Sequence, residues 1–224
     1  MLCRLQNVTK AYEDITPIED LDLSVEEQDY ISVSGESGAG KSTLLLLAGG
    51  MLTPSRGEIF FDGRPYSAMN DNQISVMRSA HIGYISQSIQ LLQALTVEEN
   101  IRFAQQVCRR SGFANTNPAG VEEILARLGL TEKRDHLPRY LSGGQKRRAM
   151  IAVTWARNPR LYLLDEPTND LDEYWAEQVM ELCTDLHASG KALILVTHNP
   201  QYAQRAEKRY RLQGGKLVED GRAL

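Results

Sequence analysis

The chain has 224 residues, of which 42% are hydrophobic and 24% charged, and its formal net charge is −4. This length fits one compact domain with an inserted lobe, and the composition is that of an ordinary globular protein. An acidic chain has no overall basic field that attracts nucleic acid, and the short cluster Lys146-Arg147-Arg148 does not change that balance. We therefore expect no nucleic-acid partner.

The cysteines and the apolar runs exclude two further classes of protein. Cys3, Cys108 and Cys183 are widely spaced, which favours reduced thiols over a disulfide or zinc framework. The N-terminal segment lacks the basic-then-apolar pattern of a secretion signal. The longest apolar run, 44–52, contains two glycines and is shorter than the roughly 20 residues of a membrane-spanning helix. We expect a cytoplasmic chain whose membrane role comes through another protein.

The first and last thirds of the chain show strand patterns. Segments 2–8 and 18–25 alternate apolar with polar residues, which predicts a small antiparallel sheet. Three short apolar runs predict buried strands: 30–34 (YISVS), 161–164 (LYLL) and 192–197 (ALILVT). Helical patterns at 42–51 and 173–187 follow the first two of these runs, and this alternation favours a parallel α/β sheet. Residues 210–218 (YRLQGGKLV) predict a hairpin about Gly214-Gly215.

The middle of the chain is mainly helical in pattern. Apolar residues recur at three- and four-residue spacing in 97–110, 120–128 and 144–157. We interpret 88–158 as a helical lobe inserted into a core lobe made of 1–87 and 159–224.

A phosphate-binding loop (the P-loop, residues 35–43) lies between a predicted strand and a predicted helix. Residues 35–42, GESGAGKS, match the full pattern GxxxxGK[ST]. The glycines let backbone N–H groups turn toward phosphate oxygens, Lys41 adds charge at the β- and γ-phosphates, and Ser42 would ligate Mg²⁺. A plain glycine turn that opens a helix is the alternative, and the strand–loop–helix context disfavours it. The expected nucleotide-binding residues are Gly35, Glu36, Ser37, Gly38, Ala39, Gly40, Lys41, Ser42 and Thr43.

Two carboxylates follow the apolar strand at 161–164. In a protein with a P-loop, a carboxylate at this edge of the sheet holds the Mg²⁺ shell, which favours Asp165. The next residue, Glu166, could polarise an attacking water as general base. Solvated acids that cap the next helix are the alternative, and the pair alone does not decide between the two.

Two more polar residues should reach the same edge of the sheet. His198 follows the strand at 192–197, and Gln87 ends a short strand at 82–86. A lone histidine is more often structural or exposed than catalytic, and a glutamine at such a place is unremarkable. Their joint spacing carries the functional interpretation.

A second candidate anion site lies at 141–145, which read LSGGQ. The segment offers the Ser142 hydroxyl, the bare backbone of Gly143 and Gly144, and the Gln145 carboxamide at a predicted helix N-terminus. Backbone N–H groups and the helix dipole favour an anion at such a place.

In this order, the motifs resemble the nucleotide-binding subunits of ABC transporters, over essentially the whole chain. The matching features are Tyr12, the P-loop, Gln87, LSGGQ, LLDE at 163–166, Leu171-Asp172 and His198. The resemblance implies a single ABC ATPase domain of the α/β class. Its expected parts are a P-loop NTPase core with a mainly parallel sheet, a small N-terminal antiparallel β subdomain and an inserted α-helical subdomain. It also implies hydrolysis of ATP with Mg²⁺ held by Ser42, Gln87 and Asp165.

The resemblance also implies a role for each motif. Subunits of that family pack head to tail, so that LSGGQ of one chain completes the ATP site of the other. Contact with the ATP site of a second copy, or of a paralogous subunit, is implied for Ser142, Gly143, Gly144, Gln145 and Asp172. Tyr12 would stack on adenine, although a strand-end core aromatic is the alternative. Glu166, His198 and Gln87 form the expected catalytic set.

The expected function is that of an ATPase subunit on the cytoplasmic face of the cell membrane. Segments 83–101 and 196–217 resemble the ATPases of lipoprotein release, macrolide efflux and bacitracin resistance, together with a cell-division ATPase. Residues 169–172 read NDLD, whereas typical members of that group read GNLD, and soluble ABC ATPases of translation are closer here. We expect the chain to drive a separate permease that exports or extracts lipid, lipoprotein, peptide or drug. The alternatives are a mechanical ATPase of a membrane complex that transports nothing, and a soluble ABC ATPase.

The resemblance places a permease contact beside Gln87. Residues 88–92 (SIQLL) are apolar where a surface loop is ordinarily polar. We expect part of Ile89, Leu91 and Leu92 to be exposed as an interface. The alternative is that these side chains anchor the helical lobe.

Overall fold

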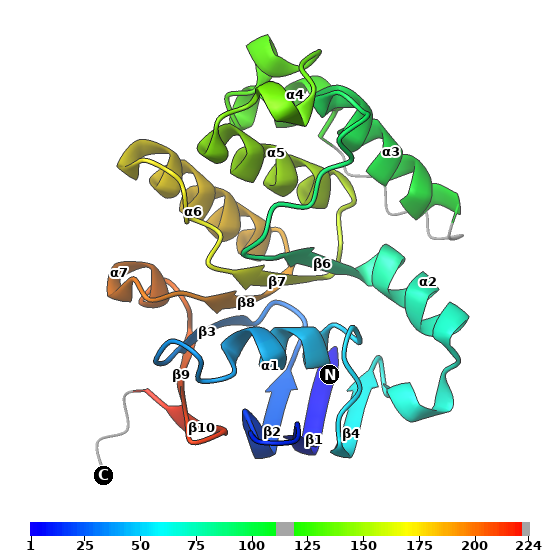
Figure 1. Ribbon diagram of the computed structural model, residues 1–224, viewed down its shortest axis with the longest axis vertical. Helices are drawn as coiled ribbons and strands as arrows, with labels where there is room; N and C mark the ends of the chain where they lie inside the picture. Colours follow the sequence, from blue (N-terminus) through cyan, green and yellow to red (C-terminus); the bar gives the residue numbers. More distant parts are fainter. Residues whose placement is uncertain (111–118, 221–224) are drawn as a thin grey trace.

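The computed structural model describes residues 1–110 and 119–220, and Figure 1 shows the arrangement of their helices and strands. The strands are β1 (Cys3–Lys10), β2 (Ile18–Val25), β3 (Tyr30–Ser34), β4 (Arg56–Phe61), β5 (Arg64–Pro65), β6 (Ile82–Ile85), β7 (Leu161–Asp165), β8 (Ala192–Val196), β9 (Lys208–Gln213) and β10 (Lys216–Glu219). The helices are α1 (Lys41–Ala48), α2 (Asp71–His81), α3 (Val97–Arg110), α4 (Val121–Arg127), α5 (Gly143–Ala156), α6 (Glu173–Ala188) and α7 (Pro200–Ala203). None of these helices is both long and apolar enough to span a bilayer.

The strands of the described residues form two sheets. One has the order β2-β1-β4-β5 and is antiparallel. The other has the order β10-β9-β3-β8-β7-β6, and its strands pair in parallel except for the edge hairpin β9-β10. The predicted α/β class, with an antiparallel N-terminal sheet beside a mainly parallel core sheet, is confirmed.

The core strands are apolar throughout because both faces of the core sheet are covered. In β7, Leu161 and Leu163 join a cluster formed with α1 and the antiparallel sheet, while Tyr162 and Leu164 join a cluster formed with α5 and α6. Figure 1 shows the same layers, with α3 and α4 beyond α5. Helices α3, α4 and α5 lie in the range 88–158 expected to form the helical lobe. Residues 111–118 of that range, and residues 221–224 of the core range, are outside the described residues. The division into two lobes stays a prediction.

Some predicted bounds are wrong by a few residues. α1 ends at Ala48 instead of residue 51, because Gly49 and Gly50 follow and Gly50 adopts a φ of 62°. The other predicted elements differ by at most two residues at either end, for example β1, which continues to Lys10 instead of ending at residue 8. No pattern described above predicts β4, α2 or the short elements β5 and α7.

Helix α2 buries few of its side chains, which explains why its apolar pattern is weak. Met77 and Ala80 are its buried residues. A local signal does mark its start: the Asn70 side chain accepts from the Gln73 N–H at 2.9 Å, and the Gln73 side chain accepts from the Asn70 N–H at 3.0 Å. This reciprocal capping box satisfies two backbone donors at the helix start.

The three cysteines are free and buried at separate places. Burial raises the pKa of the Cys3 and Cys183 thiols to about 12. Such thiols stay protonated at neutral pH and are poor nucleophiles, so they serve as small apolar side chains of the core.

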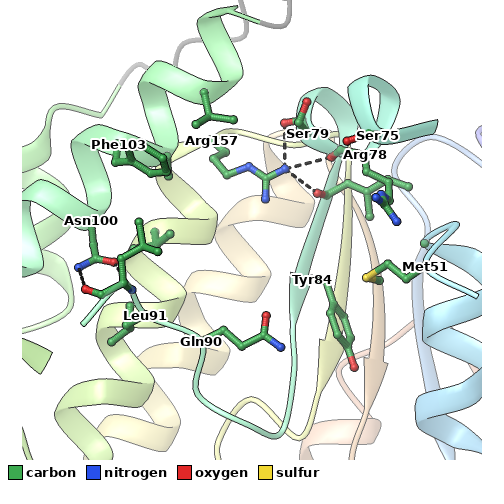
Figure 2. Close-up of a pocket in the computed structure, with 16 residues that line it drawn as sticks. Met51, Ser75, Arg78, Ser79, Tyr84, Gln90, Leu91, Asn100, Phe103 and Arg157 are labelled. Carbon is green, nitrogen blue, oxygen red and sulfur yellow. Dashed lines mark hydrogen bonds between the residues drawn. The ribbon is translucent and has the colours of Figure 1, made fainter. Parts of the chain in front are cut away.

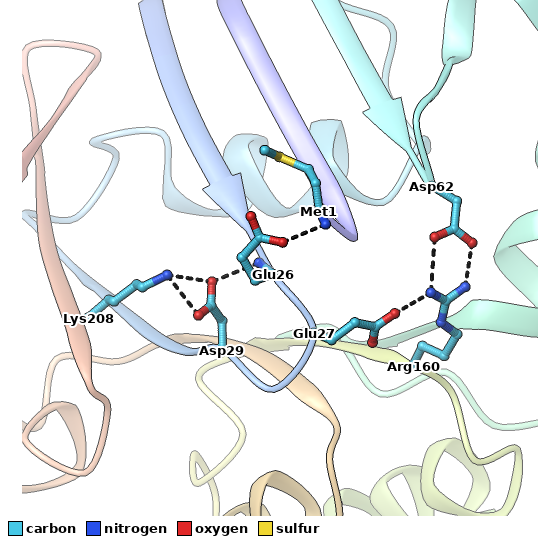
Figure 3. Close-up of polar contacts among 7 residues, drawn as sticks. All are labelled: Met1, Glu26, Glu27, Asp29, Asp62, Arg160 and Lys208. Atoms are coloured by element: carbon cyan, nitrogen blue, oxygen red, sulfur yellow. Dashed lines mark hydrogen bonds and ion pairs between the residues drawn. The ribbon is translucent and has the colours of Figure 1, made fainter.

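Ion pairs lie at the edge where the core strands begin, and those of Arg160 join the two sheets (Figure 3). Arg160, directly before β7, pairs with Asp62 after β4 and with Glu27 after β2. Lys208 at the start of β9 binds both oxygens of Asp29 at 2.7 Å. The hydrogen bond from Arg160 lowers the pKa of the Asp62 carboxyl below its usual value.

The lowered pKa of Asp62 makes a prediction about stability. We expect Asp62→Asn to reduce the free energy of unfolding by about 1 kcal/mol or less at pH 7, because the side chain is half exposed to solvent. A carboxyl with a lowered pKa stabilises the fold above its ordinary value of about 4 and loses this contribution as the pH falls through the folded value. Urea unfolding at pH 7 and at about pH 3 measures both quantities. A difference between the two proteins that persists unchanged at the acidic pH would contradict this assignment.

Candidate functional site

Four segments singled out in the sequence reach one edge of the core sheet. β3 leads into the P-loop, β6 into Gln87 and β8 into His198, and β7 ends at Asp165. Because β3, β8, β7 and β6 pair in parallel, their carboxyl ends meet at the same edge, where ligands of such sheets bind.

The P-loop has the backbone of an anion site. Gly40 adopts a φ of 102°, and a Cβ at this position would lie 2.5 Å from the carbonyl oxygen of Pro17. α1 begins directly after Gly40 with no side-chain cap, so its first N–H groups remain available to another acceptor. Lys41 Nζ donates to the carbonyls of Gly35 at 2.8 Å and Glu36 at 2.7 Å. Backbone donors and the Lys41 ammonium are thus gathered where phosphates would lie.

A cavity of about 610 Å³ lies beside the P-loop. Residues 34–39, His198 and residues 211–214 at the β9–β10 turn line it. Among the described residues, Ser142–Gln145 are not part of this lining. The chain therefore brings its P-loop and His198 together and leaves its LSGGQ segment outside.

Asp165 lies at the end of β7 with 1% of its surface exposed. Gln87 Nε2 is 3.4 Å from Asp165 Oδ1, so the two residues meet across the ends of neighbouring strands. Tyr84 on β6 lies close to the same carboxylate; its burial, and then the charge of Asp165, raise the Tyr84 pKa to about 12. Burial of a carboxylate is costly unless polar neighbours or a cation contact it.

Glu166 and His198 form a pair. His198 Nδ1 is 2.9 Å from Glu166 Oε2, while the histidine ring is exposed and the carboxylate is 8% exposed. The Glu166 backbone has a φ of 50°, which is unusual for a residue with a side chain, and its N–H donates to the Val196 carbonyl at 3.0 Å. Strained backbone of this kind is found where surrounding structure fixes a side chain for function.

The LSGGQ segment (141–145, the signature segment) begins α5 with a capping box. The Ser142 hydroxyl accepts from the Gln145 N–H at 3.2 Å, and the Gln145 side chain accepts from the Ser142 N–H at 3.0 Å. Ser142 and Gly143 are exposed, so the Ser142 O–H and the next helical N–H groups face solvent. Asp172 caps α6 in a similar way, with Oδ1 accepting from the Trp175 N–H at 2.9 Å.

Tyr12 lies just after β1 and is 48% exposed. Lys10 Nζ is 5.1 Å from the centre of its ring. The alternative that Tyr12 is a strand-end core aromatic is therefore wrong. The same N-terminal loop reaches the P-loop at Pro17, which leaves no room for a Cβ on Gly40.

A groove of about 680 Å³ lies near the Gln87 segment, between α2, α3 and α5 (Figure 2). Leu92, Phe103 and Val107 place large exposed apolar surface along it, whereas Leu91 is buried and Ile89 packs partly against the core. Leu92 is thus exposed, as expected for an interface residue, whereas the burial of Leu91 agrees with the alternative that it anchors the helical lobe.

Two partly buried networks of hydrogen bonds fix the walls of this groove. The Asn100 amide donates to the carbonyls of Leu92, Leu95 and Thr96 at 2.9–3.1 Å, and its oxygen accepts from the Leu92 N–H at 2.8 Å. Arg157, directly after α5, donates to the carbonyls of residues 78 and 79 in α2 and of residue 82 directly after it (Figure 2). Hydrogen bonds within the fold therefore hold the walls of this groove in place.

Two basic residues of the cluster 146–148 do not lie on the surface. Arg147 and Arg148 are both buried, and each donates to two backbone carbonyls. The helical position alone does not reveal this, because the carbonyls belong to distant parts of the sequence.

The fold and this edge of the sheet define a P-loop protein with an ATP-binding cassette architecture. The family model described as ABC transporter matches residues 18–169. The chain is 33% identical to the uncharacterized ABC transporter ATP-binding protein YknY of Bacillus subtilis, over 97% of this chain and 95% of that one. The dimeric cassette MJ0796, in a post-hydrolysis state bound to ADP and Pi, superposes with a TM-score of 0.89 at 31% identity and covers 98% of both chains. The chain belongs to the ABC transporter family.

Another relative is longer. The macrolide export ATP-binding/permease protein MacB of Shewanella sp. (strain W3-18-1) is 34% identical over 94% of this chain. The chain spans 32% of that protein, which carries a permease in its name.

Lys41 gives the most direct test of the P-loop. We expect Lys41→Ala to raise the dissociation constant for ATP by about 10- to 100-fold, because a charge-assisted hydrogen bond is worth about 1.5–3 kcal/mol. Titration of purified chain with ATP measures this constant. Lys133→Ala, in the turn after α4, removes an equal charge elsewhere and should bind ATP as the wild type does. Unchanged affinity in Lys41→Ala would contradict the P-loop assignment.

Proposed function

We propose that the chain hydrolyses ATP as one half of a head-to-tail dimer and drives a separate membrane permease. The observation that carries this proposal is the division of the site. One edge of the sheet gathers the P-loop, Asp165, Glu166 and His198. The signature segment does not line the cavity that lies beside the P-loop. A second copy, or a paralogous subunit, supplies the missing donors.

Mg²⁺ fits the residues at the edge of the sheet. The Ser42 hydroxyl, the Gln87 carboxamide and the Asp165 carboxylate are hard oxygen ligands of the kind that Mg²⁺ prefers. The contact of 3.4 Å between Gln87 and Asp165 supports their joint role. When bound, Mg²⁺ neutralises charge on the β- and γ-phosphates.

Glu166 is the proposed general base. Its Oε2 is held by His198 Nδ1 at 2.9 Å, which leaves Oε1 to accept a proton from the attacking water. His198 is exposed on its other side, where it is able to reach the γ-phosphate. Lys41 holds the β- and γ-phosphates once it leaves the carbonyls of the P-loop.

The remaining site residues act at the rim and across the dimer. Tyr12 stacks on adenine. Its exposed ring suits this role, because Tyr12 belongs to the loop whose Pro17 lies against Gly40 of the P-loop. Contact with the ATP site of the partner is assigned to Ser142, Gly143, Gly144, Gln145 and Asp172. Because the capping box uses the Ser142 oxygen as acceptor, its O–H stays able to donate to a phosphate.

The permease is proposed to dock in the groove between α2, α3 and α5, at the cytoplasmic face of the membrane. The exposed side chains of Leu92, Phe103 and Val107 support an apolar partner segment there. Export or extraction of a lipid, lipoprotein, peptide or drug is consistent with the name of the macrolide export relative.

Glu166→Gln tests hydrolysis and dimer formation together. Glutamine keeps the size and hydrogen bonding of glutamate but cannot take a proton, so we expect the rate of hydrolysis to fall by about 100-fold or more. ATP should still bind and hold two chains together. Phosphate release and light scattering after gel filtration with ATP measure the two effects.

Glu132→Gln provides the matched control, since Glu132 is exposed in the turn after α4. It should hydrolyse ATP at the wild-type rate. Hydrolysis by Glu166→Gln at that rate would show that another group is the base. A wild-type chain that neither hydrolyses ATP nor dimerises with it would contradict the proposed function itself.

Leu92→Glu tests the docking groove. A charge at this exposed apolar position should prevent binding of the membrane protein that co-purifies with the wild-type chain, because the carboxylate loses water without gaining a partner. Hydrolysis by the isolated chain should not change. Pull-down from detergent-solubilised membranes, with an ATPase assay in parallel, measures both.

Val218→Glu on β10 places the same charge at another exposed apolar side chain. It should keep the membrane partner. Equal loss of the partner in both variants, or retention by Leu92→Glu, would place the docking surface elsewhere.

A further inference from the structure

Arg147 has the largest fully buried side chain among the described residues. It lies on α5, two residues after the signature segment, and is 1% exposed. Removing a guanidinium from water is costly unless its donors are satisfied by well-placed acceptors. The contacts of Arg147 therefore indicate what its burial achieves.

Those contacts reach two segments far away in the sequence. Nη1 donates to the Ser86 carbonyl at 2.6 Å, and Nη2 donates to the Gln87 carbonyl at 2.6 Å. Nη2 also lies 3.4 Å from Asp170 Oδ2, in the loop between β7 and α6. One planar group thus holds the backbone of Gln87 and a side chain of the 166–172 loop at once.

Each of these segments continues into a proposed nucleotide contact. The Gln87 side chain reaches Asp165, in the site of its own chain. On the other side, Gly144 packs so closely that a Cβ there would lie 2.9 Å from the Asp170 carbonyl oxygen. Asp170 is two residues before Asp172, and Gly144 and Asp172 are both assigned to the ATP of the partner.

We propose that Arg147 is a positioning residue that couples the two ATP sites of the dimer. This inference rests on the proposed head-to-tail function. Within one chain, Gln87 serves the chain's own ATP, whereas the signature segment and Asp172 serve the partner's ATP. Arg147 ties the Gln87 backbone to the start of α5 and to the 166–172 loop. A shift of Gln87 on binding of the chain's own ATP therefore moves the signature segment and Asp172, which contact the partner's ATP, and the reverse also holds.

Arg148 provides a matched control on the next position of the same helix. It is also buried, and its Nη1 donates to the carbonyls of Leu128 at 2.6 Å and Gly129 at 3.1 Å. Its guanidinium lies 3.8 Å from the ring centre of Trp175. These contacts hold α6 and the turn after α4 against α5, and none of them is made to Gln87 or Asp170. The charge of Asp172 also acts on Arg148, so Arg148→Gln controls for the contacts to Gln87 and Asp170 alone. A purely structural effect of a lost buried arginine should appear equally at both positions.

The test compares Arg147→Gln with Arg148→Gln in the full chain. For Arg147→Gln we expect ATP affinity of the monomer within about twofold of wild type, and a Hill coefficient for hydrolysis that falls from above 1 to about 1. The ATP concentration needed for dimerisation should rise by about fivefold or more, the lower range of a typical coupling between sites. Arg148→Gln should lower the melting temperature yet keep the wild-type Hill coefficient.

Arg147→Lys keeps the charge and is the variant to use if the glutamine variant does not fold. A lysine cannot present two parallel donors to both carbonyls, so the Hill coefficient should still fall. A wild-type Hill coefficient in every folded Arg147 variant, an equal fall in Arg148→Gln, or a wild-type chain without cooperativity would overturn the coupling role. A wild-type chain that does not hydrolyse ATP at all would instead contradict the proposed function.

Discussion

The parallel register of four core strands is the constraint on which the rest of this structure depends. Ile85 pairs with Leu164, Asp165 with Val196, and Val33 also with Val196. The residues that follow these positions therefore emerge at one level, and Glu166 comes within 2.9 Å of His198 although 32 positions separate them in the sequence. A slip of one residue in this register would turn every side chain of the strand to the other face and separate the groups.

The apolar core has to offset the cost of gathering these groups. Asp165 and Glu166 are buried carboxylates, and Glu166 also has a left-handed backbone. Burial of both faces of the core sheet, in one cluster with α1 and another with α5 and α6, provides the stabilisation. The usual preferences for apolar burial and right-handed backbone are violated at the site and followed in the core around it. This pattern is expected where function determines the residue.

The sequence predicts those parts of the fold whose pattern is local. Core strands appear as continuous apolar runs, and the P-loop and LSGGQ carry their chemistry in adjacent residues. β4 and α2 lack such a run, because β4 is partly exposed and α2 buries little, although the Asn70–Gln73 capping box is visible in the sequence. Burial of Arg147 could not be predicted, since its acceptors lie about 60 positions away and a basic triplet ordinarily indicates a solvated face.

The two glycines of the signature segment differ in what this chain requires of them. At Gly144, a Cβ would lie 2.9 Å from the Asp170 carbonyl oxygen, so packing within the chain accounts for the glycine. At Gly143, the nearest atom to such a Cβ is the Asp170 Cβ at 3.8 Å, an ordinary contact. Glycine lowers helix stability relative to alanine, although the described residues leave room for a side chain at Gly143. The proposed head-to-tail dimer would account for this glycine: a phosphate of the partner's ATP would approach the exposed helix start, where backbone N–H groups and the helix dipole favour an anion.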